Sequence, residues 1–324
     1  MTFNNLTRCA ALVVVALAGT AHAQSYPAKP IRLVVPFAPG GPNDILGRLV
    51  AQNVTQQLGQ NVVVENRGGA GGTIGIEYTV RLPGDGYSIA MGGSSNLAVA
   101  PSLYARLSYD PLKDITPIIN VAHVPYAIAV NPTVPAKNVK ELIALAKTKK
   151  GYLSYGSSGS GSMSSLAAEL MKSMSGADIM HVSYKGTAPA LMDVIAGNID
   201  MMLADLAVIQ RHAAAGKLRA VGVTGSKRLA SAPDLPTVGE SGLKGYAIEP
   251  WFGVVGPAGI PNDIVATLNR TIAASLKGGE VLKRLGALGY EPIGGTPEQF
   301  AATIRADIVS YAKIVKAAGI EPNK

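Results

Sequence analysis

The chain has 324 residues, a formal net charge of +8 at pH 7 and a single cysteine, Cys9. Its length allows one large core or two smaller ones, and one cysteine excludes an internal disulfide or a site built from several thiolates. The lysines and arginines are scattered and form no recognised nucleic-acid-binding motif, so the basic balance suits a small anionic ligand better than nucleic acid.

The first 23 residues have the pattern of a signal peptide. Arg8 gives a weakly basic start, residues 10–18 are apolar, and Ala21-His22-Ala23 is an A-x-A cleavage signal. The apolar run is too short to span a bilayer comfortably. We therefore expect cleavage after Ala23 and export to the periplasm as a soluble protein.

Along the first half of the chain, short apolar runs alternate with helix-like runs. The hydrophobic pattern predicts strands at residues 31–35, 61–65, 87–91 and 126–130, and helices at residues 44–58, 73–81 and 138–149. The first strand, helix and second strand together form a βαβ unit.

The second half continues the alternation and ends in helices. We expect strands at residues 153–155, 179–182, 199–203 and 218–223 and around residues 254–255, with helices reaching residues 174 and 196. Three helical runs close the chain, near residues 262–276, 281–288 and 297–317.

This alternation predicts an α/β fold with mostly parallel sheets flanked by helices. In such sheets ligands bind beyond the carboxyl ends of the strands. Without its leader the chain is long enough for two lobes with a cleft between them. Chain crossings near residues 121–125 and 245–251 would place residues 24–123 and 248–324 in the first lobe and residues 124–247 in the second.

A loop rich in glycine and proline follows the first strand and leads into a helix. The first N–H groups of a helix have no partner inside it, and the helix dipole places partial positive charge there, so such a loop binds anions with its backbone. Glycines allow a close approach of backbone to ligand, and prolines keep the loop stiff. We predict ligand contacts here from Phe37, Pro39, Gly40, Gly41 and Asn43.

Asp44, next in this loop, is expected mainly to cap the helix and brace the loop, with Asn43 as the alternative cap. An acid that faced an anionic ligand would repel it. Asp44 is therefore a ligand-binding candidate only if the ligand carries an amino group.

The same device recurs at residues 156–162, where a short strand enters a loop of glycine and serine before another helix. By composition this segment could be a flexible linker, but its place between strand and helix favours ligand contact. The serine hydroxyls can donate hydrogen bonds. The candidates here are Ser157, Ser158, Gly161 and Ser162.

Other polar residues follow predicted strands and are weaker candidates. Ser94 and Asn96 either line the cleft or cap a helix, and Asp205 either caps the next helix or reaches across the cleft. Tyr184 and Thr187 are expected in the cleft.

Catalytic and cofactor chemistry have no candidate constellation in the sequence. The glycines of residues 68–72 lack the G-x-G-x-x-G and G-K-[ST] patterns of nucleotide loops. The histidines that follow the leader show no metal-ligand spacing, and no G-x-S-x-G elbow is present. We expect no enzyme activity, no metal and no cofactor.

Taken together, the motifs resemble the tripartite tricarboxylate transporter receptor family, also called Bug or TctC proteins. The matching stretches run through nearly the whole chain after the leader: Pro36-Phe37-x-Pro39-Gly40-Gly41-x-x-Asp44 with Arg48, Glu65-Asn66-Arg67 with Gly69-Ala70-Gly71-Gly72, Asp85-Gly86-Tyr87, Tyr155-Gly156-Ser157-x-Gly159-x-Gly161-Ser162, Val182-x-Tyr184-Lys185-Gly186, and Trp251-x-Gly253. Each stretch is weak alone, but their order and spacing are specific.

The resemblance implies a monomeric, type II-like periplasmic binding protein whose lobes close on a small mono-, di- or tricarboxylate. The ligand would pass to a two-subunit membrane permease. The family holds a carboxylate with backbone amides, hydroxyls and bridging waters from the two glycine loops. It often has histidine where this chain has Ser165, so ligand preference could differ there. Two alternatives stay open: a ligand-sensing receptor that feeds a signalling partner, and an exported α/β enzyme.

Overall fold

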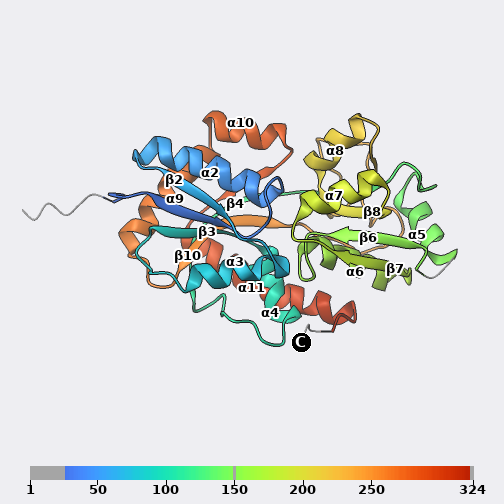
Figure 1. The fold of residues 1–324 in the computed structure, drawn as a ribbon, viewed down its shortest axis with the longest axis horizontal. Helices are drawn as coiled ribbons and strands as arrows, with labels where there is room; N and C mark the ends of the chain where they lie inside the picture. The colour runs from blue at the N-terminus through green and yellow to red at the C-terminus, as the bar shows by residue number, and fades with distance from the viewer. Residues whose placement is uncertain (1–25, 149–150, 322–324) are drawn as a thin grey trace, which may run out of the picture.

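The computed structural model describes residues 26–148 and 151–321, so the expected signal peptide lies outside the described residues. Two β-sheets with helices around them form the molecule (Figure 1). The first lobe is built on a six-stranded sheet and the second on a five-stranded sheet. The two-lobed α/β fold predicted from the sequence is therefore confirmed.

The six-stranded sheet has the order β11-β4-β10-β3-β1-β2. Strands β1, β2 and β3 are parallel, whereas β10 runs antiparallel to both β3 and β4 and β11 runs antiparallel to β4. The strands are β1 (Ile31–Val35), β2 (Val62–Asn66), β3 (Ser88–Gly93), β4 (Ile115–His123), β10 (Trp251–Pro257) and β11 (Glu291–Gly294).

The five-stranded sheet has the order β7-β6-β8-β5-β9. Strands β7, β6 and β8 are parallel, and β5 is antiparallel to both β8 and β9. The strands are β5 (Tyr126–Val130), β6 (Leu153–Ser157), β7 (Ile179–Ser183), β8 (Met201–Asp205) and β9 (Arg219–Val223).

Helices cover the sheets; in Figure 1, α2 and α10 lie above the first sheet, and α3 and α4 lie below it. The terminal helix α11 packs on β4 and also contacts α6 of the second lobe. The helices are α2 (Pro42–Leu58), α3 (Thr73–Val80), α4 (Ala100–Leu103), α5 (Val139–Thr148), α6 (Met163–Ser175), α7 (Thr187–Ala196), α8 (Leu206–Ala214), α9 (Asn262–Leu276), α10 (Gly279–Ala287) and α11 (Pro297–Ala317), with short turns η1 (Ala70–Gly72) and η2 (Ser95–Val99). No helix among the described residues has both the length and the apolar composition to cross a membrane.

The expected mostly parallel pairing is wrong, because both sheets are mixed. The antiparallel pairs arise where the chain leaves one sheet for the other: β5 enters the second sheet and β10 re-enters the first. The sequence pattern also missed β4 and β11. The hydrophobic run of β4 contains Pro117, and three of the four residues of β11 are exposed, so neither has the pattern of a buried parallel strand.

Two chain segments connect the lobes and run side by side. The first links β4 to β5, and the second links β9 to β10. The N–H of Val124 in the first donates to the carbonyl of Pro250 in the second at 2.9 Å. The N–H of Ile248 donates to Thr224 at 2.8 Å, and the N–H of Thr224 donates to Tyr126 at 3.0 Å. Within residues 26–148 and 151–321, these two segments are the covalent connections between the two sheets. We call them the hinge segments.

Away from the hinge the lobes touch, so the structure is a closed one. The N–H of Ala38 in the first lobe donates to the carbonyl of Lys185 in the second at 3.4 Å. Gly71 lies against Gly161 so closely that a Cβ atom on Gly71 would be 2.7 Å from the carbonyl carbon of Gly161. Two loops that the sequence singled out therefore face each other.

Candidate ligand-binding site

A small cavity that is partly open to solvent lies between the facing loops. Both lobes contribute to its wall. The lining residues are Phe37, Gly41, Pro42, Asn43, Ser95, Tyr126, Ser158, Ser162, Met163, Thr187 and Phe252. Six of the predicted site residues are among them: Phe37, Gly41, Asn43, Ser158, Ser162 and Thr187.

Three helices begin at this cavity. Helix α2 starts after Gly41, α6 starts after Ser162, and Thr187 is the first residue of α7. Each start presents N–H groups without a partner inside the helix and partial positive charge from the helix dipole. One of the helices belongs to the first lobe and two belong to the second, so an anion in the cavity would be held from both sides.

Asp44 holds the first loop in shape. Its carboxylate accepts hydrogen bonds from the N–H of Gly40, from Arg48 Nε and from Asn66 Nδ2, each at 3.0 Å. Burial raises the pKa of Asp44, but these hydrogen bonds outweigh burial and hold the pKa below its ordinary value. The expected helix cap by Asn43 or Asp44 is wrong, because Gly41 occupies the cap position without a side-chain hydrogen bond. Pro39 and Gly40 lie at the exposed tip of the loop.

Two buried asparagine amides near the cavity have atoms without a partner among the described residues. Asn43 is 2 % exposed, and neither its Nδ2 nor its Oδ1 has a hydrogen bond. Asn96 is fully buried; its Oδ1 accepts from the N–H of Gly93 at 3.0 Å, whereas its Nδ2 is unpaired. Unpaired buried polar atoms are costly, and a bound ligand or water is the usual partner.

Serine hydroxyls in the second loop form a connected group. Ser164 Oγ lies 2.9 Å from Ser162 Oγ and 3.2 Å from Ser158 Oγ, and it accepts the N–H of Ser158 at 3.0 Å. Ser162 also caps α6 by accepting the N–H of Ser165. Ser157 instead bonds within the loop to Gly159 and lies 2.7 Å from His181 Nε2. Ser158 and Ser162 are among the residues that line the cavity, whereas Ser157 braces the loop.

Several other predicted residues have their polar atoms engaged outside the cavity. The Tyr184 hydroxyl donates to Asp193 of α7 at 2.5 Å, and Gly161 packs against Tyr104. Ser94 bonds to the backbone of Trp251 as both donor and acceptor. Asp205 caps α8 by accepting the N–H of Ala207 at 2.9 Å. These residues surround the site without contributing to the lining given above.

The sequence did not point to Pro42, Ser95, Tyr126, Met163 or Phe252 as cavity residues. Ser95 and Met163 are neighbours of residues that were predicted, so the error is one position along the chain. Tyr126 is the first residue of β5 and Phe252 is the second residue of β10, so both lie just after the hinge segments. The pairing of those segments brings these two residues to one cavity, and no local motif signals it.

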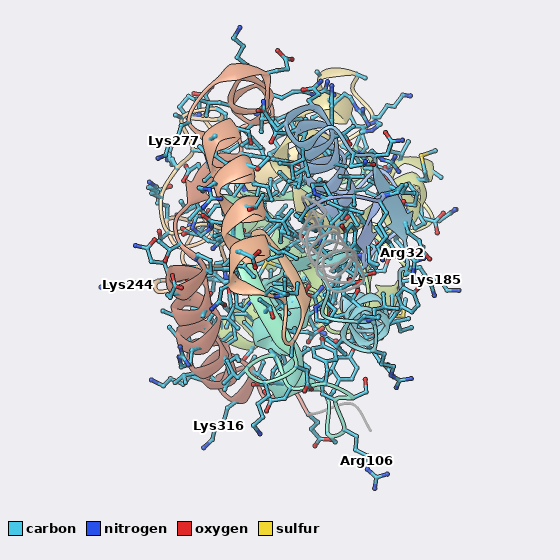
Figure 2. The ribbon with its side chains drawn as sticks, turned by 90° about the vertical axis from the view of Figure 1, so that its left-hand side faces the viewer. Arg32, Arg106, Lys185, Lys244, Lys277 and Lys316 are labelled. Atoms are coloured by element: carbon cyan, nitrogen blue, oxygen red, sulfur yellow. The ribbon has the colours of Figure 1, made fainter. Side chains whose placement is uncertain are left out.

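No residue that lines the cavity carries a charge. The cationic side chains labelled in Figure 2 lie around the outside of the molecule, and Lys185, at the end of the β7 segment, is exposed. An anion in the cavity would therefore be stabilised by backbone N–H groups and hydroxyls. Among the residues that the structure describes, no group of three or more His, Asp or Glu side chains is placed to hold a metal ion.

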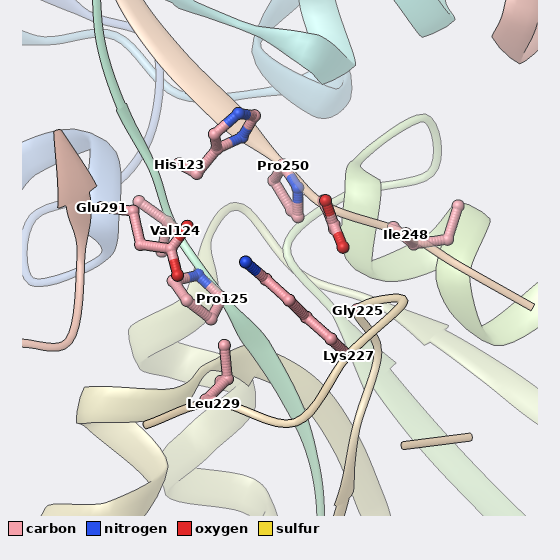
Figure 3. Close-up of a pocket in the computed structure, with 10 residues that line it drawn as sticks. His123, Val124, Pro125, Gly225, Lys227, Leu229, Ile248, Pro250 and Glu291 are labelled. Atoms are coloured by element: carbon pink, nitrogen blue, oxygen red, sulfur yellow. The ribbon is translucent and has the colours of Figure 1, made fainter. Parts of the chain in front are cut away.

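A second small cavity lies at the hinge (Figure 3). It is lined by His123, Val124, Pro125, Gly225, Lys227, Leu229, Ile248, Glu249, Pro250 and Glu291. Figure 3 shows Lys227 pointing into it with its nitrogen toward Glu291. Charges of both signs and the hinge backbone form its walls, and no helix begins there. The cavity between the loops is therefore the candidate ligand-binding site.

Comparisons with known proteins agree with this arrangement. Residues 46–320 match the model of the "Tripartite tricarboxylate transporter family receptor", TctC. The protein BugT of Bordetella pertussis is 35 % identical over 97 % of this chain and 98 % of its own length. The solved structure of Rpa4515 of R. palustris with adipate is 37 % identical, covers 92 % of this chain and 100 % of that one, and has a TM-score of 0.89.

MatC of Rhodopseudomonas palustris, solved with bound malate, is 30 % identical, with a TM-score of 0.86 over 90 % of this chain and 100 % of that one. The family match begins after β1 and the first loop, and it spans the other strands, the hinge segments and the second loop of the cavity. This chain belongs to the tripartite tricarboxylate transporter receptor family.

Proposed function

We propose that this protein is an exported solute-binding protein that captures a small organic carboxylate between its two lobes. The observation that carries the proposal is the convergence of three helix N-termini, from both lobes, on one cavity. The adipate and malate bound by similar proteins support the ligand class.

Estimated energies are sufficient for this mode of binding. Each helix dipole contributes about 0.3–1 kcal/mol, and up to about 2 kcal/mol in a partly buried site. Each hydrogen bond to a charged group contributes about 1.5–3 kcal/mol, whereas a micromolar dissociation constant needs about 8 kcal/mol. Four or five such hydrogen bonds from the two loops, less the cost of ordering the loops and the ligand, reach about 8 kcal/mol without a cationic side chain.

Family membership supports a further part of the proposal. The loaded protein would deliver its ligand to a two-subunit membrane permease of the tripartite tricarboxylate type, and it would act as a monomer and not as an enzyme. We propose that residues 1–23 direct it to the periplasm and are removed after Ala23. We also propose lobe boundaries at residues 24–123 with 248–324, and at residues 124–247. Copurification of the protein with the permease from membranes tests delivery and export. The protein without residues 1–23 is the control and should not copurify.

The binding proposal is tested by a thermal-shift screen of mono-, di- and tricarboxylates, followed by calorimetry on the acids that raise Tm. Replacing Ser158 and Ser162 together by alanine should weaken binding at least about tenfold, since both residues line the cavity and their hydroxyls hold the second loop and the start of α6 in place. Ser160→Ala is the matched control, because Ser160 is in the same loop but exposed, and its hydroxyl bonds to Ser183.

Two outcomes would contradict the proposal. One is that no carboxylate raises Tm or gives a heat of binding. The other is that the double variant and the Ser160→Ala control bind the acid equally well.

A further inference from the structure

One residue of the cavity lining has a feature that anion binding alone does not explain: the side-chain amide of Asn43 is buried and unpaired within the described residues. Asn43 is in the first turn of α2, lines the cavity and is 2 % exposed. Its Nδ2 and Oδ1 are both without a partner among the described residues. The neighbouring Asp44, by contrast, has both carboxylate oxygens engaged. Among the residues that line the cavity, Asn43 is the one whose buried side-chain nitrogen and oxygen both lack a partner within the described residues.

An asparagine amide presents a donor and an acceptor side by side. A carboxylate has acceptors only, so it can pair with Nδ2 but leaves Oδ1 facing another oxygen. An uncharged amide has the complementary pair, because its N–H can donate to Oδ1 while its C=O accepts from Nδ2. A ligand amide therefore satisfies both atoms at once.

The charge of the cavity supports the same choice. The lining has no lysine, arginine or histidine, and the positive potential comes from the helix N-termini. The remaining wall is largely apolar, from Phe37, Tyr126, Met163 and Phe252. A second carboxylate on the ligand would be buried against these side chains without a counter-charge, which is unfavourable. A neutral amide at that end avoids this.

We propose that the preferred ligand is a half-amide, with one carboxylate held by the helix N-termini and one uncharged amide paired with Asn43. This inference rests on the proposed capture of a carboxylate and specifies the class of carboxylate. It makes Asn43 the residue that selects a singly charged ligand over a dicarboxylate of the same length.

The test compares matched pairs by calorimetry on the purified exported protein: succinate with succinamate, glutarate with glutaramate, and adipate with adipamate. The half-amide is expected to bind at least about tenfold more tightly than the diacid at one or more of these lengths. Asn43→Leu, which is similar in size but has no polar atoms, should bring the ratio of the two affinities close to one. Asn43→Ala should do the same, which excludes a steric effect of leucine.

Asn53→Ala is the matched control. Asn53 is also a buried asparagine of α2, but it is not part of this cavity wall. This variant should keep the wild-type ratio, and circular dichroism with Tm verifies that each variant is folded.

Three results would overturn the inference: diacids that bind at least as tightly as their half-amides at every length, half-amides that do not bind, or a ratio that persists in both Asn43 variants. These results are distinct from failure of the proposed function. If diacids or other acids of the broader screen bind through the two loops, carboxylate capture stands and only the role of Asn43 falls.

Discussion

The hydroxyl of Tyr290 in the first lobe donates a hydrogen bond to the buried carboxyl group of Asp205 in the second. Asp205 ends β8, caps α8 and is 1 % exposed, and Tyr290 comes immediately before β11. The sequence left two roles open for Asp205, capping a helix or reaching across the cleft. In the structure it caps α8 and also contacts the other lobe, on the hinge side of the molecule.

Removing the hydroxyl from Tyr290 should destabilise the protein. In Tyr290→Phe the Asp205 carboxyl group loses a partner inside a site that excludes water, which costs about 1–3 kcal/mol. We expect the free energy of unfolding, measured by urea denaturation, to fall by that amount. Tyr152→Phe is the control, since Tyr152 is 51 % exposed and should change stability by less than about 0.5 kcal/mol. Equal effects of the two substitutions would show that the contact contributes nothing.

The same carboxyl group should make stability depend on pH. Burial raises the pKa of Asp205 to about 7 in the folded protein, against about 3.9 in an unfolded chain. Between these values the folded state binds more protons than the unfolded state. The free energy of unfolding therefore falls as pH rises from about 4 to about 7, by up to about 1.4 kcal/mol per pH unit from this group, and the dependence ends above pH 7.

Denaturation of wild type and Asp205→Asn across pH 4–8 checks this dependence. The difference between the two proteins isolates Asp205, because other titrating groups are shared. His181 and His212 are two of these groups. Burial lowers the pKa of each, so each lowers the free energy of unfolding as the pH falls. If the two curves are parallel from pH 4 to pH 8, Asp205 does not have the assigned pKa.

Asp44 should support ligand binding although it is an acid close to an anion site. In Asp44→Asn the N–H of Gly40 and the Nδ2 of Asn66 lose a charged acceptor, and the first loop loses rigidity. We expect about tenfold weaker binding of the carboxylate by calorimetry. Asp110→Asn is the control, since Asp110 is in an ion pair with Lys113 on the surface. Tighter binding by Asp44→Asn would mean that charge repulsion outweighs bracing.

Local patterns predicted most of the elements because their signals are strong. The strands Ile31–Val35 and Tyr126–Val130 and the helix Pro297–Ala317 have the predicted bounds. This helix has a capping box at Thr296 and Gln299, with Pro297 at its first position. Both signals can be recognised in any sequence.

The cavity was less predictable, because adjacent residues in one loop have different roles. Ser157 and Ser158 have the same side chain, yet Ser157 bonds to Gly159 while Ser158 lines the cavity. Backbone torsion angles decide which of these residues lines the cavity, and the sequence does not specify the torsion angles residue by residue. Tyr126 and Phe252 reach the cavity only through pairing of the hinge segments, which are far apart in the sequence.

The contact between Gly71 and Gly161 gives a direct test of closure. A Cβ atom on Gly71 would lie 2.7 Å from the carbonyl carbon of Gly161 in the opposite lobe, so Gly71→Ala should obstruct the closed arrangement. We expect a dissociation constant at least about tenfold higher than that of the wild type, with faster ligand release, and a larger radius of gyration in the presence of ligand by small-angle X-ray scattering.

Gly59→Ala separates this effect from backbone strain. Gly59 has φ +71°, close to the φ +64° of Gly71, but a Cβ atom there has no neighbour within 4 Å. Both substitutions therefore carry a similar cost of about 1–2 kcal/mol for a left-handed alanine, and both should lower Tm. Only Gly71→Ala should also weaken binding. If the two variants bind the ligand equally well, ligand capture does not require the approach of these two loops that the closed structure shows.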